Sequence, residues 1–170
     1  AAGGTLLMAL DYAHIDGPWQ LPENYRKRNG LVRYSRATAD SLFSITAQGY
    51  EGDWRATDQI PLRAVQSGLI DRFGTVDPTG GGDSHRYSLS ADWSRALGGG
   101  RSKALLYALD YDLDLISNFS YFTDPDNGDQ FQQIDQRRVY GGDWSWERVD
   151  RSMTESCRCR LRKRRFRAGE

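Results

Sequence analysis

Strand-like runs with a period of two residues are the feature that most constrains how this chain folds. Because successive side chains of a β-strand point to opposite faces, such runs predict strands with one apolar face. In 86–96, for example, apolar side chains at 87, 89, 91 and 93 alternate with polar ones at 88, 90, 92 and 94. We expect six strands, at residues 4–13, 29–37, 42–52, 86–96, 103–114 and 131–146.

The run at 105–115 shows the strongest alternation. One side carries only Leu and Tyr, from Leu105 to Leu115, and the other carries Asp110, Asp112 and Asp114. Three carboxylates spaced two residues apart on one strand form a stripe without an opposed partner for acid–base chemistry. We therefore interpret them as part of a hydrated wall.

The connections between these runs alternate in length. Long connections at 14–28, 53–85 and 115–130 are separated by short ones at 38–41 and 97–102. Outer-membrane β-barrels have short turns on one side of the membrane and long loops on the other. The pattern predicts an all-β, antiparallel transmembrane barrel segment of about six strands, incomplete without the rest of the barrel. A half-exposed antiparallel sheet of a soluble protein alternates in the same way and is the alternative.

The composition agrees with membrane strands and not with membrane helices. The mean hydropathy is −0.70, and no stretch approaches the roughly 18 apolar residues that a membrane helix needs. Trp and Tyr concentrate at the membrane interface in barrels. Tyr12, Trp93, Tyr107 and Trp144 are the candidates for such girdles.

The last twenty residues differ in charge from the rest of the chain. Residues 151–170 hold eight Lys or Arg and two Glu, whereas residues 1–150 hold 15 basic and 21 acidic residues. We place a basic tail at 149–170 outside the strand pattern, as a disordered end or an out-of-frame stretch. Its Cys157 and Cys159 make neither a zinc site nor a disulfide framework, and we expect no nucleic-acid binding.

Motifs that carry chemistry are absent from the sequence. His14 and His85 have no partner at metal-ligand spacing, and no phosphate-binding loop or nucleophile motif occurs. The loop at 124–129 contains three Asp but misses the glycine and glutamate positions of a calcium loop, so we predict a polar turn. We expect no enzyme activity, no cofactor and no metal.

Residue strings in the long connections resemble TonB-dependent outer-membrane receptors. These strings are DGPWQLPEN at 16–24, RYS at 33–35, TDQIP at 57–61, GLIDRFG at 68–74, DPTGG at 77–81, SHRYSLS at 84–90, SNFSYF at 117–122 and DQF at 129–131. Their order along the chain carries the resemblance more than any one of them does. It covers roughly 3–148, so we define 1–148 as a partial receptor barrel.

The resemblance implies a 22-stranded barrel in the outer membrane of a Gram-negative bacterium, plugged by an N-terminal domain. Such receptors take up scarce ligands, such as ferric chelates, cobalamin or glycans, with energy from the TonB complex. The expected partners are outer-membrane lipid, a small ligand such as a metal chelate, and the TonB complex through a plug domain that this chain lacks. The chain by itself should not transport anything.

Ligand capture is expected on the long connections, which would be extracellular. By position alone, seven residues are candidates for ligand binding: Trp19, Trp54, Arg63, Arg72, His85, Tyr121 and Phe122. For each of them, ordinary loop packing is the alternative. A passive porin-type barrel and a soluble all-β binding module are the alternative functions.

Overall fold

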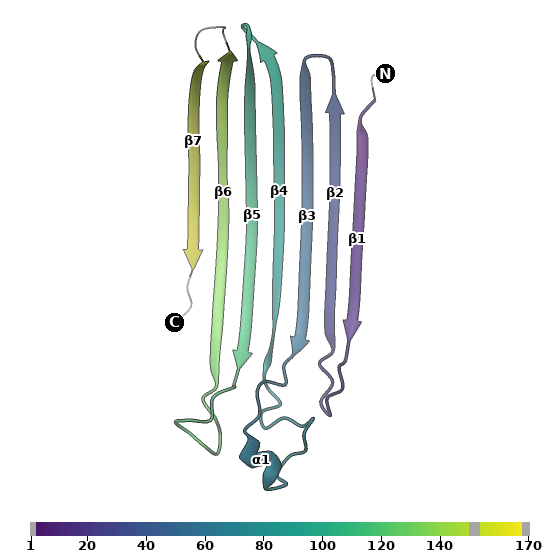
Figure 1. Ribbon diagram of the computed structural model, residues 1–170, viewed down its shortest axis with the longest axis vertical. Coiled ribbons are helices and arrows are strands. Elements are labelled where there is room, and N and C mark those ends of the chain that lie inside the picture. The colour runs from purple at the N-terminus through teal and green to yellow at the C-terminus, as the bar shows by residue number, and fades with distance from the viewer. Residues whose placement is uncertain (1–2, 150–153, 168–170) are drawn as a thin grey trace.

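The computed structural model describes residues 3–149 and 154–167, which form one antiparallel sheet (Figure 1). Seven strands lie side by side in chain order, so every strand pairs with its sequence neighbours. The strands are β1 (Thr5–Ile15), β2 (Tyr25–Ala37), β3 (Ser41–Arg55), β4 (Gly81–Leu97), β5 (Gly100–Ser117), β6 (Phe131–Val149) and β7 (Thr154–Arg167). The prediction of an all-β antiparallel fold is confirmed, with seven strands in place of six.

The connections sort by length between the two ends of the sheet, as the sequence predicted. The short turns between β2 and β3 and between β4 and β5 lie at one end, here called the short-turn end, and the long connections lie at the other, the loop end (Figure 1). Gly98 and Gly99 form the tightest turn and have φ angles of 60° and 77°. A two-residue hairpin turn of the I′ type requires positive φ at both positions, which Gly adopts without strain.

The strands extend further toward the loop end than predicted. β2 begins at Tyr25 and β4 at Gly81, several residues before the positions that alternation alone suggested. Between β3 and β4, the longest connection contains the only helix of the described residues, α1 (Leu62–Gln66). Within the described part of the chain, no helix is long and apolar enough to cross a membrane.

The seventh strand corrects the prediction that the basic tail lies outside the strand pattern. Thr154–Arg167 pairs with β6, and Asp143 of β6 forms ion pairs with Arg158 and Arg160, at 3.0 and 3.1 Å to their Nε atoms. The high content of Arg obscured a period of two, since Cys157, Cys159 and Leu161 alternate with arginines. Arginine on one face of a strand is compatible with pairing when a neighbouring strand supplies carboxylates.

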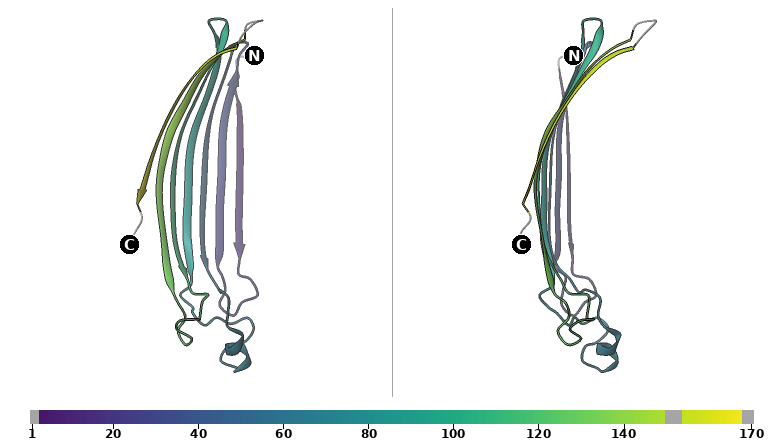
Figure 2. Two further views of the ribbon diagram at one scale, coloured as in Figure 1. Left: turned by 60° about the vertical axis from the view of Figure 1, so that its left-hand side comes forward. Right: turned by 90° about the vertical axis from the view of Figure 1, so that its left-hand side faces the viewer.

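The sheet is a single curved layer with two open edges (Figure 2). β1 and β7 each pair on one side only, so the described strands do not close into a barrel. Among the described residues, Ala64 of α1 is the sole buried apolar residue. Because nothing covers either face, this sheet lacks the apolar burial that stabilises a globular domain in water.

Candidate functional site

The strand register defines an apolar face that crosses all seven strands. Residues paired between neighbouring strands point to the same side, so the face can be followed from β1 to β7. Its central members are Leu6, Met8, Leu10, Tyr12, Val32, Tyr34, Phe43, Ile45, Ala47, Tyr87, Leu89, Ala91, Trp93, Ala104, Leu106, Ala108, Tyr140, Gly142, Trp144, Cys159 and Leu161. We call this set the apolar band.

Side chains of the apolar band are far more exposed than a core would allow. Leu10 is 87% exposed and Leu106 is 63% exposed, whereas Ser44 on the opposite face is 1% exposed. Monomeric soluble proteins rarely expose contiguous apolar patches of this extent, which usually mark a surface that another phase or partner covers. The apolar band therefore requires a covering environment that the chain does not provide.

The register corrects the orientation of β5. Leu89 of β4 pairs with Ala108, and Tyr87 pairs with Asp110, so the even-numbered residues of β5 share the apolar face. The Leu and Tyr run from 105 to 115 lies on the opposite face, together with Ser88 and Ser90. The interpretation of Asp110, Asp112 and Asp114 as a hydrated wall facing away from the apolar side is wrong, because pairing with β4 decides which side of β5 is which.

Aromatic side chains lie near both limits of the apolar band. Phe43, Trp93 and Trp144 share one row through the register toward the short-turn end. Tyr12, Tyr87 and Tyr140 lie toward the loop end, on rows that shift from strand to strand. Of the four predicted girdle residues, Tyr12, Trp93 and Trp144 lie on the apolar face. The fourth, Tyr107, lies on the opposite face over Gly141.

A diagonal line of polar side chains limits the band toward the loop end. The first charged or histidine side chains on β1 to β7 are, in order, His14, Arg28, Glu51, His85, Asp110, Arg138 and Lys163. Through the register, His14 lies level with Asp53 of β3, and Lys163 lies level with Ala47. The limit therefore shifts from position 53 to position 47, six residues over six strand steps.

Ion pairs join neighbouring members of this loop-side limit. Arg28 Nη1 lies 3.3 Å from Glu51 Oε2, and the hydroxyl of Tyr87 donates to Glu51 Oε1. Asp110 contacts two strands, with His85 Nε2 at 3.3 Å from one oxygen and Arg138 Nε at 2.7 Å from the other. These pairs neutralise part of the charge where the apolar surface ends.

Arginines limit the band toward the short-turn end. Arg36 of β2, Arg95 of β4 and Arg148 of β6 are the first charged residues of the apolar face in that direction, and all three are exposed. Arg36 lies level with Phe43 and Arg95 with Ser41. This limit shifts by two residues over two strand steps, the same slope as the loop-side limit.

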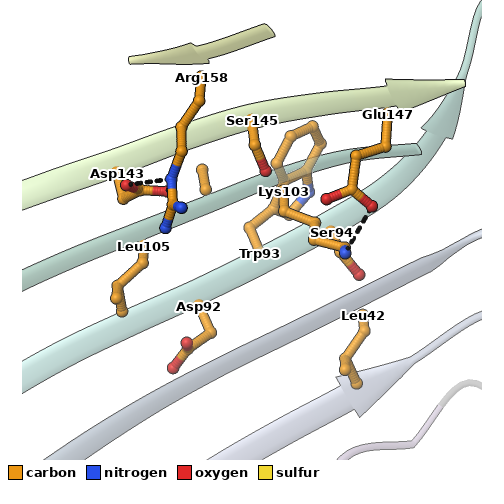
Figure 3. Close-up of a pocket in the computed structure, with 11 residues that line it drawn as sticks. Leu42, Asp92, Trp93, Ser94, Lys103, Leu105, Asp143, Ser145, Glu147 and Arg158 are labelled. Carbon is orange, nitrogen blue, oxygen red and sulfur yellow. Dashed lines mark hydrogen bonds and ion pairs between the residues drawn. The ribbon is translucent and has the colours of Figure 1, made fainter. Parts of the chain in front are cut away.

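The opposite face is polar at its short-turn end. A shallow hollow of about 520 Å³ lies there, and ion pairs between Lys103 and Glu147 and between Arg158 and Asp143 cross it (Figure 3). The hollow contains cations and carboxylates in equal number and small serines between them. Since it carries no net charge and has a wide opening, it does not select a particular ligand.

Asp77 organises the loop end through hydrogen bonds. One carboxylate oxygen accepts from the amide and hydroxyl of Thr79, and the other accepts from Asn118 Nδ2 at 2.7 Å and Gln130 Nε2 at 2.8 Å. Burial raises the pKa of Asp77, but these hydrogen bonds outweigh burial and lower the pKa to about 2. Asp77 thus ties the connection between β3 and β4 to the one between β5 and β6.

Asn118 is the buried member of this loop cluster, at 3% exposed. Its backbone amide donates to Asp58 Oδ2 at 2.8 Å, and its Nδ2 also donates to the carbonyl of Asn127 at 3.1 Å. Its Oδ1 lies against Gly128, where a Cβ would come within 2.2 Å. Glycine is required there for space and for its φ of 80°.

The loop at 124–129 forms the predicted polar turn. Asp124 accepts hydrogen bonds from the amides of Asp126 and Asn127, at 3.2 and 3.0 Å, and from Asn127 Nδ2 at 3.1 Å. Hydrogen bonds from Asn127 hold the pKa of Asp124 below its usual value. Within the described residues, no group of three or more His, Cys, Asp or Glu is arranged to hold a metal ion.

The predicted ligand-binding residues do not converge on one site. Arg63 and Tyr121 come together, because Arg63 Nη2 donates to the carbonyls of Tyr121 and Pro125 at 3.2 and 2.9 Å. Phe122, at 92% exposed, projects from the same loop. Arg72 is also exposed.

The other three predicted residues have structural contacts. Trp19 packs against Phe73, with ring centroids 6.1 Å apart, and donates from Nε1 to Glu23. Trp54 is half-buried near the loop end of β3. His85 lies within β4 and not in a loop.

Sequence reasoning missed Asp77 and Asn118, the residues that connect the loops. The Asp-Pro-Thr string at 77–79 was a usable signal, since Asp before such a turn commonly caps its own backbone. Comparison with known protein families, with curated proteins and with solved structures finds no match to this chain.

Proposed function

We propose that this chain is a segment of the wall of an outer-membrane β-barrel, of the TonB-dependent receptor type, whose apolar face contacts lipid. The apolar band carries this proposal. It crosses every strand of a single-layer sheet and ends in aromatic and then charged side chains on both sides. A lipid phase covers such a surface without any second protein layer, whereas water does not.

The height of the band supports a membrane as the covering phase. Ten residues separate His85 from Arg95 on β4 and Arg138 from Arg148 on β6, and eight separate Arg28 from Arg36 on β2. At about 3.3 Å per residue these intervals span roughly 26–33 Å along the strands. With a strand tilt of about 35° they span roughly 22–27 Å across the membrane, close to the ≈ 25 Å apolar band of outer-membrane barrels.

The slope of the band supports the same arrangement independently. A shift of one residue per strand step, with about 3.3 Å per residue and about 4.8 Å between strands, corresponds to a tilt of about 35°. Barrel strands tilt by about 35–45° from the barrel axis. A flat sheet covering the core of a soluble domain has no reason to carry a diagonal apolar stripe of this slope.

Closure of such a barrel needs further strands. β1 and β7 run in the same direction, because an odd number of antiparallel strands separates like from like (Figure 1). Pairing β7 directly with β1 would make a parallel contact. An antiparallel wall therefore closes only when an odd number of additional strands joins the two edges.

The proposed receptor role places ligand capture at the loop end. The loop cluster around Asp77 holds the two longest connections as one unit, and Phe122, Arg72 and other side chains remain exposed on it. The proposed ligand is small and scarce, such as a ferric chelate, cobalamin or a glycan. That the barrel is a receptor and not a passive porin depends on the residue strings that resemble TonB-dependent receptors.

Site-directed spin labelling tests the lipid-facing surface. In the full chain with Cys157 and Cys159 replaced by Ser, nitroxides are placed singly at Leu89 and Ala91 of the apolar face and at Ser88 and Ser90 of the opposite face. After reconstitution in lipid vesicles, we expect high collision rates with oxygen, which dissolves in lipid, only at 89 and 91. Equal oxygen accessibility at all four sites, or a folded and monodisperse chain in detergent-free buffer, would contradict the proposal.

A further inference from the structure

The two limits of the apolar band differ in charge. On β2 to β6, the first two apolar-face positions beyond the band at the loop end hold five carboxylates and three arginines: Glu51, Asp53, Asp83, Asp110, Asp112, Arg26, Arg28 and Arg138. At the short-turn end, the charged residues that limit the band on these strands are all arginines. The surface is therefore acidic at one limit and basic at the other.

Arg36 and Arg95 lie where a charged lipid headgroup would meet the sheet. Both are exposed, and the row that holds Phe43 and Trp93 separates them from the centre of the band. Arginine side chains at this position extend toward the interface while their stems lie along apolar surface. A guanidinium presents paired N–H donors that match the oxygens of a phosphate.

Few carboxylates compete for these arginines. Asp40, in the turn between β2 and β3, accepts from Arg95 Nε at 3.3 Å. This contact uses one edge of the guanidinium and leaves its outer nitrogens for another acceptor. Arg148 lies opposite Glu155 in the register, so the inference rests on Arg36 and Arg95.

We infer that the short-turn limit of the apolar band binds the phosphodiester headgroups of anionic phospholipids. This inference rests on the proposed function, because it requires the apolar band to lie in a bilayer. The acidic loop-side limit has the opposite preference. Together the two limits orient the sheet with its short turns in the leaflet that contains the anionic phospholipid.

Partition onto vesicles tests the inference with the full chain. Two vesicle types are compared, one of phosphatidylcholine and one in which part of it is replaced by phosphatidylglycerol. We expect stronger partition onto the second type, with each of Arg36→Gln and Arg95→Gln lowering it about fivefold, as expected for about 1 kcal/mol per basic residue near an anionic surface. Added salt should reduce the preference, since it screens exposed charges.

Arg101→Gln is the matched control. Arg101 lies at the same end of the β4–β5 hairpin as Arg95 but on the opposite face, where its Nη1 is 3.4 Å from Ser94 Oγ. We expect this variant to partition like the unmodified chain. Equal partition onto both vesicle types, or an equal loss in Arg101→Gln and Arg95→Gln, would overturn the inference. Absence of the folded chain from both vesicle types would instead overturn the proposed function.

Discussion

Single residues fix the loop end of the molecule more than its strands do. Asp77 accepts hydrogen bonds from two other segments, and Asn118 is buried between them. Polar networks of this kind hold a loop in one conformation when every member has partners. The loop cluster therefore gives a flat strand array a defined surface at one end.

The pKa of Asp77 makes the loop cluster sensitive to acid. Its folded pKa of about 2 lies below the unfolded value of about 3.9, so its contribution is present above pH 4 and is lost as the pH falls toward 2. We expect Asp77→Asn to destabilise the loop cluster by about 1 kcal/mol, a value reduced for partial solvent screening, and to remove this acid dependence. Protease cleavage rates in 56–80, measured against pH, check this.

Asp126→Asn is the control for that measurement. The side chain of Asp126 is exposed, and its contact with the network is made by its backbone amide. Its cleavage profile should match that of the unmodified chain. An unchanged acid dependence in Asp77→Asn would show that another carboxylate controls the loop cluster.

At the scale of one element, β5 is the strand whose orientation depends on its neighbours. Its two sides are both rich in Leu, and only pairing with β4 and β6 assigns Leu106 to the apolar face and Leu105 to the opposite face. Leu106 lies over Gly142, and Tyr107 on the other side lies over Gly141. Large side chains over glycines on both faces help to fix this register.

A charge placed on each side of β5 measures this orientation. We expect Leu106→Arg to reduce insertion of the full chain into vesicles by about 2–4 kcal/mol, the range for Arg near the bilayer midplane. Leu105→Arg should change insertion little, since its side chain points to the opposite face. The fraction of chain protected from protease by vesicles is the measurement, and a larger effect at position 105 would reverse the assigned face.

The whole molecule is an open sheet whose stability depends on what surrounds it. The described sheet has two unpaired edges and almost no buried apolar residue. Open edges present free backbone groups, which are costly in lipid and prone to pairing in water. The central strands have neighbours on both sides and are expected to be the most stable part.

Hydrogen exchange of the full chain in vesicles tests this gradient. Amides of β3, β4 and β5 should exchange slowest, and half of the amides of β1, those facing its open edge, should exchange fastest. Protection of β1 equal to that of β4 would show that the edge is paired, for example with a second copy. Adding strands that close the barrel should remove the gradient.

The sequence by itself determined the strands, their antiparallel order and the sorting of long and short connections. Those properties follow from local alternation and from turn residues such as Gly98 and Gly99. It failed at β7, where arginines hid the alternation, and at β5, where both sides are apolar. Of the proposed site residues, it brought out Arg63 and Tyr121 but missed Asp77 and Asn118.

Only the tertiary structure decided which face each strand presents and where the apolar band ends. A strand's period of two leaves its orientation undetermined by itself, because either side can face either way until a neighbour is paired. The register across seven strands settled this and revealed a diagonal band with an acidic and a basic limit. The loop cluster likewise depends on contacts between residues 41 to 60 positions apart, which local sequence patterns do not encode.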